Sequence, residues 1–277
     1  MTALDDDIVP PSKELVREIA KPFRTWFSPR LYGFEKLDKD RPALYVSNHT
    51  ILGLTDGLFL GLEMYLELDV MLRPLVDHLH WEIPFWRQLI RNIGMVPGTR
   101  ESCGALMQGG EHILVFPGGR REVCKQRGEA YQLIWRNRMG FAHMAAAHGY
   151  DIIPVAAIGG EEMYDILLDA GDVMRSPLGA WLHNSGFADR YLHGGENLPP
   201  IVKGIGRTVI PKPQRHYIMV GDRIPTAQLQ GETDNMDAIR DLRTQVEDSF
   251  THMFEDLKAY RENDRDEEWW RKIFKRL

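Results

Sequence analysis

Hydrophobic and polar positions along this chain repeat with two different periods. Short apolar runs that end at turn residues predict buried β-strands at 43–46, 70–72, 113–116, 152–157 and 216–221. Longer patterned stretches predict helices at 56–66, 83–93, 100–107 and 129–148. Strands that alternate with helices across residues 43–157 predict an α/β fold. We expect a single domain over residues 31–277, with helices flanking a mixed, mostly parallel sheet, preceded by an N-terminal amphipathic helix within residues 1–30.

Both ends of the chain carry amphipathic patterns. In residues 13–27 apolar side chains recur at every fourth position, and lysines and arginines occupy the other face. A polar helix is predicted from about Asp234 to Leu277, and its last residues, 268–277, mix aromatic side chains with cations. Docking onto the core and contact with an anionic membrane both fit such patterns. We expect both segments to contact a membrane surface.

Three features bear on where the protein works. The most apolar stretch, residues 51–72, is interrupted by carboxylates, so it predicts a core helix and a strand rather than a membrane-spanning helix. The acidic start at 5–7 lacks the basic and then apolar pattern of a secretory signal. Two cysteines, Cys103 and Cys124, favour a reducing compartment. We therefore expect a cytoplasmic protein that binds membranes peripherally.

Charge and composition limit the class of partner. A formal net charge of −6 leaves no basic excess to neutralise phosphates, which argues against nucleic-acid binding. With 43% hydrophobic residues, the chain is able to build a sizeable core. Residues 184–213 are rich in glycine and proline and lack periodicity, so they predict a long functional or disordered loop.

A histidine and a carboxylate follow the first predicted strand. In an α/β sheet, His49 at the carboxyl end of that strand is a candidate general base, and Asp56 would fix its tautomer. The alternative is that His49 merely ends the strand and Asp56 caps the next helix. A straight helix would separate the two Cα atoms by about 10.5 Å of rise, too far for a hydrogen bond. The pair therefore needs a compact turn, which Gly53 permits, and otherwise Glu122 is the expected partner.

A second polar segment follows the third predicted strand and combines paired glycines with paired arginines: Gly118, Gly119, Arg120 and Arg121. The glycines permit backbone conformations closed to other residues and let a ligand approach the main chain. The arginines offer permanently charged donors to a phosphate or carboxylate. The alternative is a charged surface turn in which they pair with Glu122 or Glu101. Together with His49, the segment suggests acyl transfer to a hydroxyl.

Four ordered blocks within residues 40–225 resemble those of the glycerolipid acyltransferase superfamily: Asn48-His49 with Asp56, Arg100 after Gly94, Phe116–Glu122 and Ile153–Val155. The best-known members of that superfamily acylate glycerol phosphate and lysophosphatidate. The loop at 116–122 and the segment at 154–164 are similar to those of the monoacylglycerol and diacylglycerol acyltransferase branch. Enzymes with phosphate acceptors usually carry Glu where this chain has Gly118, which argues against a glycerol-phosphate acceptor.

The resemblance implies roles for these residues. His49 would be the general base and Asp56 its partner. Substrate contacts would come from Asn48, Arg100, Gly118, Gly119, Arg120, Arg121 and Glu122. The resemblance also implies acyl-CoA or an acyl carrier protein as donor, a lipid acceptor, and no metal or redox cofactor.

These inferences predict an O-acyltransferase that moves a fatty acyl group from acyl-CoA, or an acyl carrier protein, to the hydroxyl of a glycerolipid or related lipid alcohol. Two other functions fit the same sequence. A lipid-binding or membrane-recruitment protein would keep the scaffold without catalysis. An acyl thioester hydrolase would use water as the acceptor.

Overall fold

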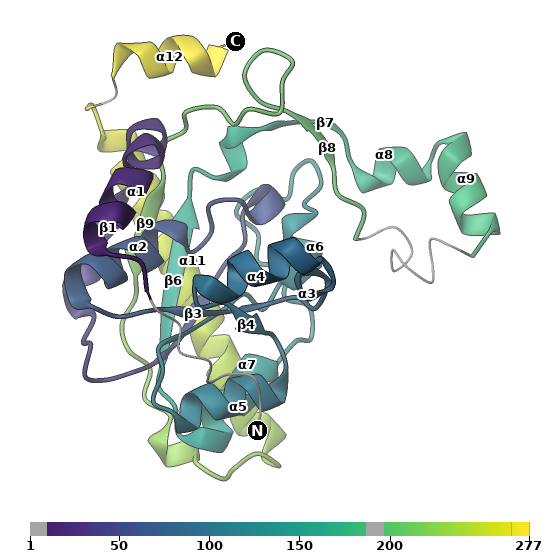
Figure 1. Ribbon diagram of the computed structural model, residues 1–277. Coiled ribbons are helices and arrows are strands. Elements are labelled where there is room, and N and C mark those ends of the chain that lie inside the picture. Colours follow the sequence, from purple (N-terminus) through teal and green to yellow (C-terminus); the bar gives the residue numbers. More distant parts are fainter. Residues whose placement is uncertain (1–9, 187–196, 267, 277) are drawn as a thin grey trace.

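The computed structural model describes residues 10–186, 197–266 and 268–276. Within them, seven strands form one sheet in the order β1-β9-β6-β2-β5-β3-β4 (Figure 1). Their bounds are β1 Arg30–Tyr32, β2 Leu44–Ser47, β3 Arg73–Val76, β4 Val96–Pro97, β5 Ile113–Val115, β6 Ile152–Ile158 and β9 Tyr217–Val220. All neighbours pair in parallel except β6 and β9, which are antiparallel. The predicted mixed, mostly parallel sheet is confirmed.

Helices cover both faces of this sheet (Figure 1). Their bounds are α1 Lys13–Phe27, α2 Leu58–Leu68, α3 Leu79–Glu82, α4 Pro84–Asn92, α5 Arg100–Gln108, α6 Gly119–Val123, α7 Gly140–His148, α8 Ala170–Met174, α9 Pro177–Asn184, α11 Met236–Asn263 and α12 Trp269–Arg276. A separate hairpin pairs β7, Asp165–Leu168, with β8, Ile201–Lys203. Among the described residues, no helix is both long and apolar enough to cross a bilayer.

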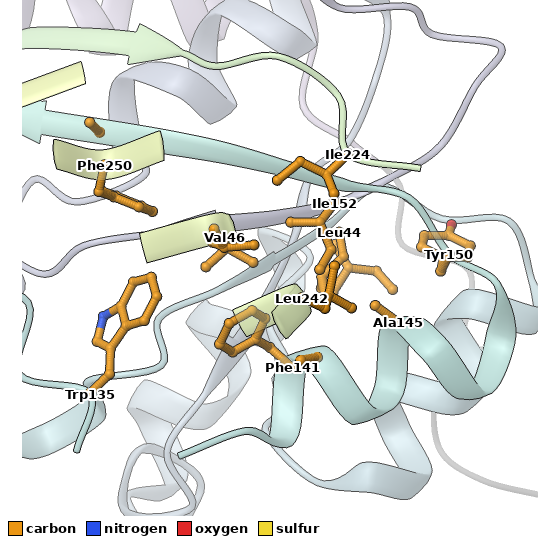
Figure 2. Close-up of a cluster of buried hydrophobic side chains, with 14 of the residues drawn as sticks. Leu44, Val46, Trp135, Phe141, Ala145, Tyr150, Ile152, Ile224, Leu242 and Phe250 are labelled. Carbon is orange, nitrogen blue, oxygen red and sulfur yellow. The ribbon is translucent and has the colours of Figure 1, made fainter. Parts of the chain in front are cut away.

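The central strand β2 shows how the apolar runs build two cores. Leu44 and Val46 point into a cluster that also holds buried residues of α5, α7 and α11 (Figure 2). Tyr45 points the other way, into a cluster with residues of α1 and α2. Successive side chains of a strand alternate between faces. A strand covered on both faces therefore reads as one continuous apolar run.

The helix predicted over 129–148 forms only in its last part, as α7. Residues 129–139 instead form turns, in which Tyr131 and Arg136 adopt positive φ angles of 59° and 51°. The Trp135 side chain is fully buried there and packs edge-on against Phe141 and Phe250 (Figure 2). The full-length helix was therefore a wrong prediction, because tertiary packing overrides local propensity.

Other differences concern the ends of elements and short elements that the sequence pattern did not predict, such as β1, β4 and β7. The strand predicted at 70–72 lies at 73–76, and the helix predicted at 56–66 runs from 58 to 68. The closing helix is broken in two after Asn263, where the carboxylate of Asp264 pairs with Arg215. The loop predicted at 184–213 contains β8, while residues 187–196 of it lie outside the described part of the chain.

Candidate active site

The carboxyl ends of the parallel strands bring four loops to one edge of the sheet. His49 follows β2, the glycine–arginine segment follows β5, Glu161 follows β6, and Asp77 follows β3. Parallel pairing of β6 with β2, β2 with β5 and β5 with β3 makes this the same edge for all four. Open α/β sheets commonly bind ligands at this edge.

His49 and Asp56 meet through a tight turn. The Nδ1 atom of His49 lies 2.7 Å from Oδ2 of Asp56. The chain between them forms a short 3-10 turn at 51–53, in which Leu52 and Gly53 have positive φ angles. Space is also restricted at Gly53, because a Cβ atom there would lie 2.9 Å from Cγ1 of Val123. The compact turn predicted through Gly53 is confirmed, and the bond to the His49 ring comes from Asp56.

The carboxylate of Asp56 is buried but well supplied with hydrogen bonds. It accepts from the backbone N–H of Thr50 at 2.7 Å and from the Thr50 hydroxyl at 2.6 Å. Burial by itself raises the pKa of the Asp56 carboxyl. The hydrogen bond and charge of His49 and the two hydrogen bonds from Thr50 outweigh that effect, so the pKa of Asp56 is lowered. An ionised Asp56 accepts from Nδ1–H of His49, which leaves the Nε2 lone pair for a substrate proton.

The rest of His49 is held on three sides. Its ring stacks on Phe116, with centroids 4.0 Å apart and planes 11° from parallel. Its backbone N–H donates to Glu122 Oε2 at 3.1 Å, and its carbonyl accepts from Lys125 Nζ at 2.9 Å. Glu122, the alternative ring partner, therefore binds the backbone of His49 instead. Only 18% of the His49 side chain is exposed, so the imidazole is fixed in orientation.

Lys125 and Glu161 form a buried ion pair beneath this histidine. Their side chains are 2% and 6% exposed. The second carboxylate oxygen of Glu161 accepts the backbone N–H of Ile51 at 3.2 Å. Burial raises the pKa of Glu161, and Lys125 partly offsets that effect. The pair ties both ends of the 49–51 segment to the loops after β5 and β6.

Gly118 is required for the position of Glu122. A Cβ atom at residue 118 would lie 2.1 Å from Oε2 of Glu122. Burial raises the pKa of Glu122, and Lys125 and His49 offset this rise only in part. Gly119 has a positive φ of 48°, and Arg138 donates to the carbonyls of Pro117 and Gly118. The glycine segment is thus a braced turn rather than a loose loop.

The remaining predicted site residues have protein partners or lie on the surface. Arg120 forms a bidentate pair with Asp77, with distances from 3.0 to 3.3 Å. Arg121 is buried and pairs with Glu129. Neither arginine pairs with Glu122 or Glu101 as the surface-turn alternative predicted, and their contact with a substrate anion stays a prediction.

Asn48 and Arg100 differ sharply in their surroundings. Both ends of the Asn48 amide bond the backbone of Ala157, at 2.8 and 3.0 Å, so this side chain extends the pairing of β2 with β6. Arg100 is exposed at the start of α5. Substrate contact by either residue stays a prediction.

Sequence reasoning missed several residues that shape the site. Lys125 is one, and a single lysine after Val123-Cys124 gave no signal of burial. Another is His216, whose Nδ1–H donates to the carbonyl of Gln214 at 3.0 Å. Its Nε2 therefore accepts from the hydroxyl of Thr55 at 2.7 Å, next to Asp56 in sequence. Burial lowers the pKa of His216 to about 4, so the ring is neutral at pH 7.

A cavity of about 320 Å³ opens beside the buried ion pair. Ile51, Lys125 and Glu161 belong to its wall, together with Tyr164 and Ile166 from the segment after β6. The described residues contain no group of three or more His, Cys, Asp or Glu side chains arranged to hold a metal ion. The candidate site is one histidine–carboxylate pair beside a braced glycine turn, and the cavity borders the Lys125–Glu161 pair that holds the His49 backbone.

Comparison with known proteins points to one family. Residues 28–158 match the protein family described as "Acyltransferase". "Phytyl ester synthase 2, chloroplastic" of Arabidopsis thaliana is 28% identical over 242 residues, which is 83% of this chain and 34% of that protein. "DGAT1/2-independent enzyme synthesizing storage lipids" of Bos taurus is 29% identical over 130 residues, which is 47% of this chain and 38% of that protein. This chain thus spans little more than a third of either relative.

A solved structure has the same fold. The crystal structure of the 1-acyl-sn-glycerophosphate (LPA) acyltransferase PlsC from Thermotoga maritima superposes with a TM-score of 0.52 at 16% identity, covering 89% of this chain and 80% of that one. The residues matched by the family, 28–158, include His49, Asp56, the glycine–arginine segment and the 153–155 block. The comparisons thus agree with the resemblance of residues 40–225 to the glycerolipid acyltransferase superfamily.

Proposed function

We propose that this protein transfers a fatty acyl group from a thioester, acyl-CoA or an acyl carrier protein, to the hydroxyl of a lipid alcohol. Nε2 of His49 takes the hydroxyl proton while the alcohol oxygen bonds to the thioester carbonyl carbon. The carbon–sulfur bond then breaks, and the thiolate leaves and takes up a proton. The products are an ester and a free thiol.

One observation carries this proposal, the hydrogen bond of 2.7 Å between His49 Nδ1 and Asp56 Oδ2. It holds the imidazole in the tautomer whose Nε2 is basic, and it stabilises the imidazolium that forms when the proton moves. The stacked Phe116 ring and the bonds to the backbone of His49 prevent the imidazole from turning away. Backbone amides near Gly118 and Gly119 are our candidates to stabilise the negative charge on the carbonyl oxygen.

We infer that the acceptor is an alcohol without a phosphate group. Both arginines of the glycine–arginine segment already have carboxylate partners, Asp77 for Arg120 and Glu129 for Arg121. A phosphate would have to displace one of these carboxylates. The names of the two relatives, which refer to phytyl esters and storage lipids, agree with an uncharged acceptor.

We further propose that α1 and α12 contact a membrane surface. Three apolar residues of α1 face outward, with Leu15 51%, Ile19 59% and Phe23 45% exposed. On α12, Trp269 is 74% exposed. The buried Arg271 fastens α12 to the backbone carbonyls of α1 and to Pro213 O at 3.2 Å. Together the two helices present an apolar surface with nearby cations, which suits peripheral binding to an anionic bilayer.

The His49→Ala variant tests the proposed function. Release of free thiol from a long-chain acyl-CoA is measured with a panel of lipid alcohols, and the esters are identified by mass spectrometry. Loss of a positioned base is expected to lower the rate by about 10²–10⁴-fold. His252→Ala, at an exposed position of α11, is the matched control and is expected to keep full activity.

The outcomes separate the three candidate functions. A folded His49→Ala protein with full activity would contradict the base assignment. Thiol release by the wild type without any acylated lipid would identify a thioester hydrolase. A wild type that binds lipid but releases no thiol would identify a lipid-binding protein.

A further inference from the structure

Helix α4 turns most of its apolar side chains toward solvent. Phe85 is 92% exposed, Leu89 51% and Ile93 48%, and these three residues recur at every fourth position. Trp86 beside them is 42% exposed. Of the apolar residues of the helix, only Ile90 is buried, at 1% exposure, and it anchors the helix to the domain. One face of α4 and the residue that caps its end therefore form a solvent-exposed apolar strip, which we call the α4 strip: Phe85, Trp86, Leu89 and Ile93.

This strip lies on a segment that starts at the active-site edge of the sheet. The chain leaves β3 at that edge and reaches α4 through Asp77 and α3. Asp77 is bound there by Arg120 of α6, with its oxygens 3.0 and 3.1 Å from Nη2, and Figure 1 shows α3 and α4 close to α6. Glu122, which holds the backbone of His49, belongs to the same short helix α6.

The apolar surface of α1 and α12 also lies at this edge, but beside β1, at the opposite end of the strand order from β3 and β4. Arg30 of β1 pairs with Tyr217, and Tyr217 pairs with Ile158 at the carboxyl end of β6. Helix α1 ends just before β1, so its last turn lies at this edge, where α12 is fastened to it (Figure 1). The sheet order places β1 and β3 on opposite sides of β2, which carries His49. Two exposed apolar surfaces thus lie on either side of the candidate site.

The charge on α4 favours one class of partner. The segment 83–93 contains Arg87 and Arg91 and no carboxylate, although the whole chain carries a formal charge of −6. Aromatic and aliphatic side chains next to arginines suit the interface of an anionic bilayer. A second copy fits less well, because a symmetric contact through the same face would bring the arginines of both copies together.

We propose that the α4 strip is a membrane-docking surface for anionic lipid, which turns the entrance of the candidate site toward the bilayer. The inference rests on the proposed function for its purpose, since a lipid acceptor would then enter directly from the membrane. The α4 strip inserts its apolar side chains among the lipid tails, while Arg87 contacts the headgroups. Together with α1 and α12, it fixes the orientation of the domain on the surface.

Co-sedimentation with vesicles tests the proposal. Vesicles of phosphatidylcholine alone and of phosphatidylcholine mixed with phosphatidylglycerol are used with the full-length protein. The double variant Phe85→Ser, Leu89→Ser is expected to bind the mixed vesicles at least about tenfold more weakly, because both side chains lose their burial in lipid. The matched control introduces serines at two exposed polar positions of the same helix, Gln88→Ser with Asn92→Ser, which removes no apolar side chain, and is expected to bind within about twofold of wild type. Arg87→Gln is expected to weaken binding to the mixed vesicles about fivefold and to leave binding to phosphatidylcholine unchanged.

A second readout keeps this inference separate from the proposed function. Acyl transfer to a detergent-dispersed acceptor is expected to be unchanged in the Phe85→Ser, Leu89→Ser variant, since neither side chain belongs to the candidate site. Wild-type vesicle binding by that variant would overturn the α4 proposal and leave the result for His49 untouched. Light scattering that shows the variant to be a monomer and the wild type a dimer would also overturn it, in favour of a contact between copies.

Discussion

Replacing Lys125 with methionine tests the network beneath His49. The ammonium group donates to the His49 carbonyl at 2.9 Å and pairs with Glu161, and both side chains are almost fully buried. Methionine keeps most of the length of the side chain and removes both interactions. The change leaves the Glu161 carboxylate without its cation, although it still accepts from the backbone N–H of Ile51.

The magnitude follows from the burial of the pair. Removing one partner of a buried ion pair costs about 3–5 kcal/mol of unfolding free energy. Burial already raises the pKa of Glu161, and loss of Lys125 raises it further. Protonation of Glu161 therefore limits the loss at low pH. The destabilisation by Lys125→Met grows as the pH rises through the folded-state pKa of this carboxyl.

Unfolding in urea, followed by tryptophan fluorescence at pH 5 and pH 8, measures these losses. Adding Glu161→Gln to Lys125→Met removes the unpaired charge and is expected to recover about 2 kcal/mol at pH 8. Lys36→Met is the control, because its exposed pair with Asp222 is expected to contribute at most about 1 kcal/mol. A loss below about 1 kcal/mol for Lys125→Met, or a double variant no more stable than the single one, would refute the reasoning.

Two further predictions concern neighbouring groups. Asp56→Asn removes the charge that fixes the His49 tautomer. It is expected to lower the rate of thiol release by about 10²–10⁴-fold and to change the free energy of unfolding little. A rate close to wild type would contradict that role. The pKa of His216 is about 4 in the folded protein against 6.5 for a free histidine, so the unfolded chain takes up this proton first as the pH falls. The contribution of His216 to the free energy of unfolding is therefore complete above about pH 6.5 and falls by about 3 kcal/mol as the pH is lowered toward 4. In urea unfolding, His216→Gln is expected to remove this pH dependence.

The pair of His49 and Asp56 shows how much of the candidate site could be predicted from residues close together in the sequence. His49, Asp56 and Gly53 lie within eight residues of one another, and the requirement for a compact turn follows from helix geometry alone. The structure contains that turn and the bond to Asp56. The parallel sheet was likewise predictable, because buried strands and amphipathic helices follow one another along the chain.

The partners of the charged side chains were not predictable from residues close in the sequence. Arg120 pairs with Asp77, 43 positions away, and Lys125 pairs with Glu161, 36 positions away. Such contacts depend on which loops meet at the edge of the sheet, and the sequence pattern near each residue does not predict which loops these are. For the same reason the helix predicted over 129–148 is half replaced by turns, since burial of Trp135 outweighs local propensity.

The amino-acid sequence by itself therefore determined the order of the main strands and helices, the family resemblance and the condition that His49 and Asp56 meet only through a compact turn, because each depends on residues close in the chain. Only the tertiary structure decided that Glu122 binds the backbone of His49, that Lys125 is buried, and that most apolar side chains of α4 face solvent. Burial and charge pairing depend on packing between segments that are far apart in the chain, so they cannot be predicted from local sequence alone.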